Sequence, residues 1–114
     1  MENCAPKLQK FIVWAPDYTD EGTLELRMSV REAHLGHNQK YIDDGTIRVG
    51  GGVLTADSFP GKPDMKFHGS FLLYEVESIE VVRNFIETDI YYTAGVWDKD
   101  KIVILPVVLA TPFP

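Results

Sequence analysis

Four polar side chains between residues 27 and 38 have the types and the spacing that acid–base chemistry needs. At about 100° per residue on a helix they fall side by side in one band, whose members are Arg27, Arg31, His34 and Asn38. An imidazole takes up and returns a proton near neutral pH, which makes His34 the candidate base. The guanidinium of Arg31 or Arg27 can bind a carboxylate or enolate oxygen as negative charge develops there. The band therefore predicts proton transfer next to a carbonyl group, without a metal ion.

Two apolar stripes flank this polar band on the same helix. One stripe consists of Leu24, Met28, Leu35 and Ile42, and the other of Leu26, Val30 and Tyr41. A polar band between two apolar stripes suits neither bulk solvent nor a dry core. We therefore expect the polar band to line a cavity within a face that otherwise looks suited to packing.

The elements that position these side chains follow from hydrophobic periodicity and from turn residues. The pattern predicts strands over 10–15, 46–55, 67–76 and 101–110, one long helix over 23–43, and a shorter helix that follows an N-cap at Ser78 and ends near Asp89. The last strand should be buried and at a sheet edge, because Pro106 cannot donate a ladder hydrogen bond. Residues 90–98 should be aromatic and irregular. This order predicts a ferredoxin-like α+β fold, with a four-stranded antiparallel sheet and two helices on one face.

Two features of the predicted strands bear on function. The second strand contains Gly50, Gly51 and Gly52, which either bend the strand as a bulge or let the backbone approach a ligand closely. The first and last strands carry large apolar residues on both sides, so the sheet face without helices needs a cover. A second copy of the chain can supply that cover, and we expect a homodimer.

Composition limits the class of protein. With 114 residues the chain fits one domain, 1–114, in which we expect 1–9 to be flexible. A net charge of -6 argues against nucleic acid and anionic membrane surfaces as partners. Cys4 is the only cysteine, so there is no intrachain disulfide framework or thiolate metal cluster. The start lacks a secretory signal and no stretch has the roughly 20 apolar residues of a membrane span, so we expect a cytoplasmic protein.

Three groups of residues together resemble a known family. They are Arg31-Glu32-Ala33-His34-Leu35, then Asp44-Gly45-Thr46-Ile47 leading to Gly51-Gly52-Val53-Leu54, and finally Thr88-Asp89-Ile90-Tyr91 followed by Gly95-Val96-Trp97. In this order and spacing the chain resembles the YciI-like (YCII-related) proteins of the dimeric α+β barrel superfamily. The resemblance implies a ferredoxin-like protomer, a dimer, and a histidine–aspartate pair in a cleft between helix and sheet, which falls on His34 and Asp89. Ile90 and Val53 depart from the family pattern, which often has proline at both positions.

The pair has a chemical rationale of its own. A carboxylate of Asp89 that accepts the other ring N–H of His34 would fix the imidazole tautomer and support its charged form. Structural roles compete with this interpretation. His34 would serve equally as a hydrogen-bonded core histidine, Asp89 as a helix cap, and Arg31 as a partner of surface carboxylates. Trp14 and Trp97 belong either to the core or to the wall of an aromatic pocket.

The sequence favours a cofactor-independent lyase or isomerase that acts on a small cyclic or unsaturated carbonyl compound. A non-catalytic metabolite-binding or accessory dimer would use the same cleft. A haem-dependent or cofactor-free oxygenase of the same superfamily is a further alternative. An RNA-recognition module shares the element order, but residues 67–74 match its third-strand pattern only at their end. His37 and His68 share no motif with His34, so we expect no metal site.

Overall fold

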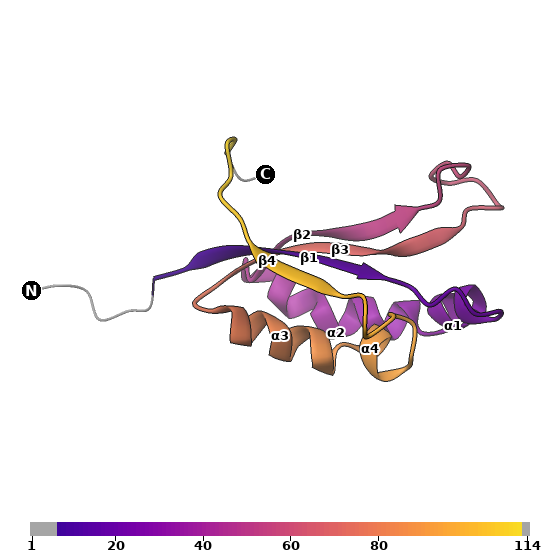
Figure 1. Ribbon diagram of the computed structural model, residues 1–114, viewed down its shortest axis with the longest axis horizontal. Coiled ribbons are helices and arrows are strands. Elements are labelled where there is room, and N and C mark those ends of the chain that lie inside the picture. The colour runs from indigo at the N-terminus through magenta and orange to yellow at the C-terminus, as the bar shows by residue number, and fades with distance from the viewer. Residues whose placement is uncertain (1–6, 113–114) are drawn as a thin grey trace, which may run out of the picture.

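The computed structural model describes residues 7–112 and has the architecture that the element order predicts (Figure 1). Its elements are β1 (Gln9–Pro16), α1 (Thr23–Ser29), α2 (Arg31–Asp43), β2 (Ile47–Leu54), β3 (Phe67–Val76), α3 (Ile79–Thr88), α4 (Ile90–Thr93) and β4 (Val103–Pro106). The strands form one antiparallel sheet in the order β2-β3-β1-β4. This is the ferredoxin-like order, and it confirms the predicted α+β fold class.

The core lies between the sheet and the helices, because side chains alternate across each strand. On β1, Phe11 and Val13 point toward the helices and are buried, whereas Ile12 points to the other face and is exposed. Figure 1 shows α2, α3 and α4 on the same side of the sheet. The opposite side carries no helix among the described elements, and we call it the open face.

The long helix predicted over 23–43 is two helices, which corrects the sequence interpretation. Val30 separates α1 from α2 with φ -107° and ψ 6°. Its N–H still bonds the Leu26 carbonyl at 3.2 Å, and the His34 N–H bonds the Val30 carbonyl at 2.9 Å. Neither proline nor glycine lies at this position, so the periodicity continues across the break and gives no sign of it.

One of the two apolar stripes beside the polar band is exposed to solvent, although the face as a whole looked suited to packing. Leu24, Met28, Leu35 and Ile42 each keep more than a third of their surface accessible. The stripe that packs against the core is the other one, formed by Leu26, Val30 and Tyr41. A helical wheel tells which residues share a face, but not which face meets the sheet. The polar band lies between the two stripes as predicted, but only one of the stripes packs against the core.

The remaining strands differ from the prediction in detail. β4 lies at a sheet edge as expected, but it is shorter than predicted and it is not buried, with Val103 41% and Leu105 54% exposed. In β2 the register shifts between Ile47 and Val49 and again between Val53 and Leu54, so the irregularities flank the three glycines.

The structure also bears on the predicted N-terminal segment and on membrane spans. β1 begins at Gln9, the last residue of the segment 1–9 that we expected to be flexible, and residues 1–6, with Cys4, lie outside the described part. Among residues 7–112 no helix is long and apolar enough to cross a membrane.

Candidate active site

A cavity of about 310 Å³ lies between α2 and the β2–β3 half of the sheet. Its polar lining consists of Arg27, Arg31, His34, Asn38, Arg48, Ser70 and Tyr91. Leu35 and Ile42 of the exposed stripe border the same cavity, and so do Gly50, Gly51 and Gly52 of β2. The band of polar residues predicted from helical spacing therefore does line a hollow.

His34 and Asp89 meet at this cavity, 55 residues apart in the chain. Nδ1 of His34 lies 2.8 Å from Oδ1 of Asp89, and the two side chains are 12% and 1% exposed. A carboxylate can only accept a hydrogen bond, so Nδ1 carries the proton when Asp89 is ionised. The lone pair of the neutral imidazole is then on Nε2, the ring nitrogen that a general base would use.

The Asp89 carboxylate is held by three donors and by its place in the chain. Besides His34, the Tyr91 N–H donates to Oδ1 at 2.8 Å and Asn38 Nδ2 donates to Oδ2 at 3.0 Å. Asp89 has an extended backbone, with φ -68° and ψ 144°, where α3 ends and α4 begins. Its bond to the Tyr91 N–H is the N-cap of α4. The capping role and the pairing with His34 are therefore both present.

Aromatic rings fix the orientation of the imidazole. The rings of His34 and Tyr91 stack with centroids 3.7 Å apart and planes 8° apart, and Trp97 meets His34 edge-on at 6.2 Å. Burial raises the pKa of the Tyr91 phenol, although the charges of Arg27 and Arg31 oppose that rise. The phenol thus stays protonated near neutral pH. A ring restrained on two sides keeps Nε2 in one position relative to the cavity.

Arg27 is buried and already paired, which limits what it can offer a ligand. Its Nη1 donates to both carboxylate oxygens of Asp17, at 2.8 and 2.9 Å, and its Nη2 donates to Ser70 Oγ at 2.9 Å. The guanidinium carbon lies 4.6 Å from the ring centroids of both Phe67 and Tyr91. Burial raises the pKa of the Asp17 carboxyl, and the Arg27 charge works against that rise. Arg27 therefore anchors the cavity floor with its charge compensated.

Arg31 differs from Arg27 in having no fixed partner. It lies on the exposed side of α2 at the cavity wall, and within residues 7–112 its guanidinium makes no hydrogen bond or ion pair. All of its donors are available to a ligand. Of the two predicted arginines, Arg31 is the one placed to bind an anionic oxygen directly.

The two tryptophans predicted as substrate-binding residues lie elsewhere. Trp14 is on the open face, where its ring lies 5.5 Å from that of His68, and it does not line the cavity. It lies on the side of β1 that faces away from the helices, because its neighbours Val13 and Ala15 point inward. Trp97 is fully buried behind His34 and donates its indole N–H to Ser70 at 3.1 Å.

Ser70, Asp17 and Phe67 are site residues that the sequence reasoning missed. Ser70 alternates with Leu72 and Tyr74 on the inward face of β3, so a small polar residue in a buried apolar pattern was its signal. Asp17 follows the buried strand β1 directly and looks like a strand end. Nothing in the local sequence distinguishes Phe67 from an ordinary strand residue.

The glycines of β2 make room for aromatic rings. A Cβ on Gly52 would lie 2.5 Å from Cε1 of Phe67, and a Cβ on Gly51 would lie 2.9 Å from Cε1 of Phe71. The absence of a side chain at Gly52 thus allows the Phe67 ring to lie over Arg27. The register shifts lie beside these glycines, and the close approach seen at them is that of aromatic side chains of β3.

Replacing Gly52 by Ala is expected to destabilise the protein by about 1–3 kcal/mol, because the Phe67 ring must move away from Arg27. Chemical denaturation measures the change. Gly36→Ala is the matched control, since a Cβ at this exposed helical position meets no atom within 4 Å and should stabilise α2 by roughly 0.5–1 kcal/mol. Equal stability of Gly52→Ala and the unchanged protein would contradict the packing role.

The donor set of the cavity is suited to acid–base chemistry. Across residues 7–112, no three histidine, cysteine, aspartate or glutamate side chains are grouped closely enough to hold a metal ion. The cavity instead brings together an imidazole backed by a carboxylate, an available guanidinium and two hydroxyl groups. These groups can bind, take up and return protons.

The chain is similar to known proteins in sequence and in structure. Residues 10–105 match the YCII-related domain. The chain belongs to the YCII-related family. This confirms the resemblance seen in the sequence. The protein is 36% identical over 89 residues to Protein YciI of Escherichia coli O6:H1, across 77% of this chain and 87% of that protein.

Two further relatives bear on the chemistry of this YCII-related protein. It is 34% identical over 89 residues to derivative of benzaldehyde biosynthesis cluster protein C of Emericella nidulans, across 78% of this chain and 89% of that protein. It is similar in structure to 5-chloro-2-hydroxyhydroquinone dehydrochlorinase (TftG) of Burkholderia phenoliruptrix AC1100, solved with 2,5-dihydroxybenzoquinone. The TM-score is 0.69 at 30% identity, across 84% of this chain and 90% of the other.

Proposed function

We propose that this YCII-related protein is a cofactor-independent lyase for a small ring compound that carries carbonyl or phenolic oxygens. The observation that carries the proposal is the His34–Asp89 pair, whose geometry leaves Nε2 as the basic nitrogen at a cavity. The structural relative whose name describes a dehydrochlorinase, bound to a dihydroxylated quinone, supports the substrate class. A double-bond isomerisation would use the same proton transfer.

The reaction step is redox-neutral and uses only groups of this chain. Nε2 of His34 takes a proton from the substrate, and the electron pair left behind forms a new double bond. The leaving group, such as chloride, departs with its own bonding pair, so the sum is loss of HCl or water. Asp89 stabilises the imidazolium that forms, because its carboxylate accepts the Nδ1 proton.

Arg31 stabilises the negative charge that appears on a ring oxygen in this step. Its guanidinium has no other fixed partner among the described residues, and charged hydrogen bonds are the stronger kind. A cavity of about 310 Å³ is at the lower end of ligand-binding pockets and suits a molecule with a single ring.

The proposed activity is tested with 5-chloro-2-hydroxyhydroquinone as the substrate and chloride release as the readout. The purified protein is expected to release chloride well above the rate in buffer, together with a quinone product that absorbs visible light. Binding of 2,5-dihydroxybenzoquinone without any chloride release would instead favour the non-catalytic binding protein. Neither binding nor release would reject the substrate class.

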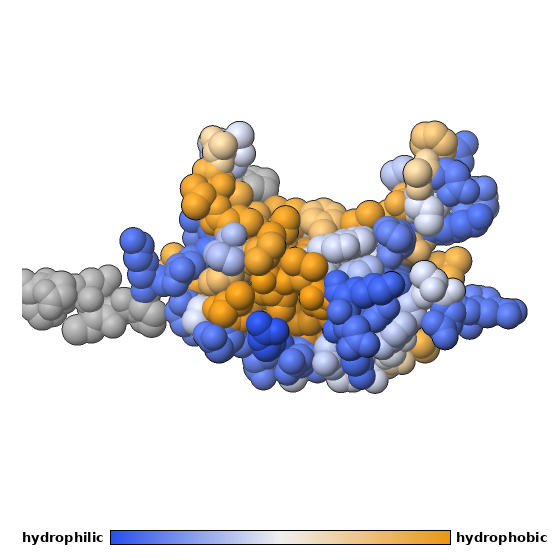
Figure 2. All heavy atoms as spheres, in the orientation of Figure 1, coloured by the Kyte–Doolittle hydropathy of each residue, from blue (hydrophilic) through white to orange (hydrophobic). Residues whose placement is uncertain are grey.

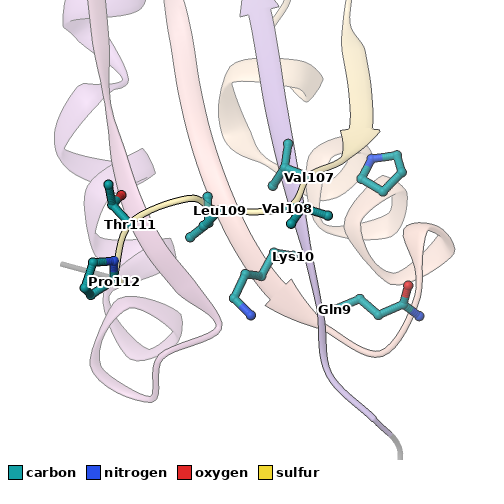
Figure 3. A pocket seen from close by; sticks show the side chains of 8 residues that line it. Gln9, Lys10, Val107, Val108, Leu109, Thr111 and Pro112 are labelled. Carbon is teal, nitrogen blue, oxygen red and sulfur yellow. The ribbon is translucent and has the colours of Figure 1, made fainter.

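We also propose that the protein is a homodimer through the open face. Exposed apolar side chains gather there, namely Ile12, Phe71, Val103 and Leu105. Figure 2 shows the apolar surface over β4, between two raised segments: the C-terminal tail and the β2–β3 loop. Beside β1 the tail frames a hollow of about 660 Å³, where Val107 to Pro112 pass Gln9 and Lys10 (Figure 3). Val108 on this tail is 98% exposed, which suits a surface that a second copy covers.

Leu105→Glu should therefore convert a dimer into a monomer, because it places a charge in the apolar surface. Light scattering coupled to size exclusion measures the mass, with a value of twice one chain expected for the unchanged protein. Asn84→Glu adds the same charge on the exposed side of α3 and should leave the mass unchanged. A monomeric unchanged protein at micromolar concentration would contradict the proposal.

A further inference from the structure

Ser70 sits at the floor of the cavity with both of its acceptor positions occupied. It lies on the inward face of β3, is 4% exposed, and lines the same cavity as His34. Its Oγ is 2.9 Å from Arg27 Nη2 and 3.1 Å from Trp97 Nε1. Guanidinium and indole nitrogens donate hydrogen bonds and do not accept them, so Ser70 is the acceptor in both.

The hydroxyl proton of Ser70 consequently has no hydrogen-bond acceptor among the described residues. A serine hydroxyl has two lone pairs and one proton, and here both lone pairs are used. Within residues 7–112 no group accepts that proton. A buried donor without an acceptor costs free energy, so such a donor in a cavity wall is a place where a ligand gains by supplying an acceptor.

The two accepted bonds also fix where the Ser70 proton points. With both lone pairs directed at fixed N–H groups, the third position around Oγ is set by tetrahedral geometry. Arg27 is held by Asp17, and Trp97 is fully buried, so neither partner moves easily. The Ser70 hydroxyl is thus a preorganised donor.

We propose that the Ser70 hydroxyl binds an oxygen atom of the substrate and makes the cavity selective for ring compounds with an oxygen at that position. This inference rests on the proposed function, whose substrate class it sharpens. A ring oxygen satisfies the orphaned donor, whereas a C–H at that position leaves it unpaired. Sites that hydrogen-bond a substrate oxygen discriminate strongly against analogues without it, because the site group is then left without a partner.

The alternative is that Ser70 only links Arg27 to Trp97 and never touches a ligand. Three variants separate the two roles, with 2,5-dihydroxybenzoquinone as the probe and calorimetric titration as the measurement. Ser70→Ala removes the hydroxyl donor, and we expect binding to weaken about tenfold or more. Trp97→Phe removes one bond to Ser70 but keeps its hydroxyl, and should weaken binding clearly less than Ser70→Ala. Ser58→Ala, in the β2–β3 loop, should bind as the unchanged protein does.

Three results of the binding titrations would overturn the inference. They are undiminished binding by Ser70→Ala, an equal loss in folded Trp97→Phe, and no binding by the unchanged protein. Thermal unfolding confirms that each variant is folded. If Ser70→Ala does not fold, a crystal structure of the unchanged protein with the probe decides, since a probe oxygen must lie within hydrogen-bond distance of Oγ. Chloride release that depends on His34 but not on Ser70 would reject this inference and keep the proposed function.

Discussion

Replacing His34 by Gln is expected to lower turnover by about 100- to 10,000-fold, the range that loss of a general acid–base group commonly produces. Glutamine retains a polar group near Asp89 but cannot exchange a proton at neutral pH. Binding of 2,5-dihydroxybenzoquinone should change only a few-fold, because Arg31 and Ser70 remain at the cavity. Chloride release measures the first quantity, and titration with the quinone measures the second.

The matched control is His37→Gln on the same helix. The His37 ring lies toward Tyr41 and does not line the cavity, so turnover should be unchanged. Turnover by His34→Gln at the rate of the unchanged protein would remove His34 from the mechanism. Turnover should then be measured for Asp89→Asn and for the double variant His34→Gln/Asp89→Asn. If the two residues act as one unit, the double variant loses much less turnover than the product of the two separate fold-losses.

Asp17→Asn is expected to cost about 3–5 kcal/mol of stability, the largest structural effect that we predict. The substitution keeps the shape of the side chain but leaves the charge of Arg27, whose side chain is 5% exposed, without compensation. Arg27 also contacts Ser70, Phe67 and Tyr91, so the cavity floor should loosen with it. The midpoint of unfolding in urea measures the effect.

An exposed ion pair provides the comparison for this prediction. Asp57 lies 3.9 Å from Lys66 with both side chains more than half exposed, so Asp57→Asn should leave the unfolding midpoint nearly unchanged. An Asp17→Asn protein that unfolds at the same urea concentration as the unchanged protein would show that Arg27 does not depend on Asp17. Its charge would then be available to ligands, as the sequence first suggested.

Much of the fold can be predicted from the sequence, because hydrophobic periodicity indicates helices and strands directly. Strand β3 and the Ser78 cap of α3 follow from alternation and from capping chemistry alone. The break at Val30 does not, since an ordinary residue there continues the helical pattern. Which stripe of α1 and α2 packs depends on how the helices are docked, and that is a property of the whole fold.

The site was predictable only in part, for a similar reason. Helical spacing brings His34 and Asn38 to one wall, but Asp89 comes from a distant corner, and only the family resemblance pointed to it. Arg27 looked like a ligand-binding residue because its partner Asp17 appears in the sequence as a strand end. Long-range pairing of this kind leaves no mark on local spacing.

The double use of Asp89 constrains how such a protein can diverge. One carboxylate starts α4 and sets the proton position on His34, so the turn of the chain and the tautomer of the ring depend on the same residue. Asn or Ser at this position would still cap the helix, yet neither offers the negative charge that an imidazolium needs. Related proteins that keep the fold but have lost proton transfer should therefore carry Asn or Ser at the position of Asp89. That one residue would then indicate that the activity has been lost.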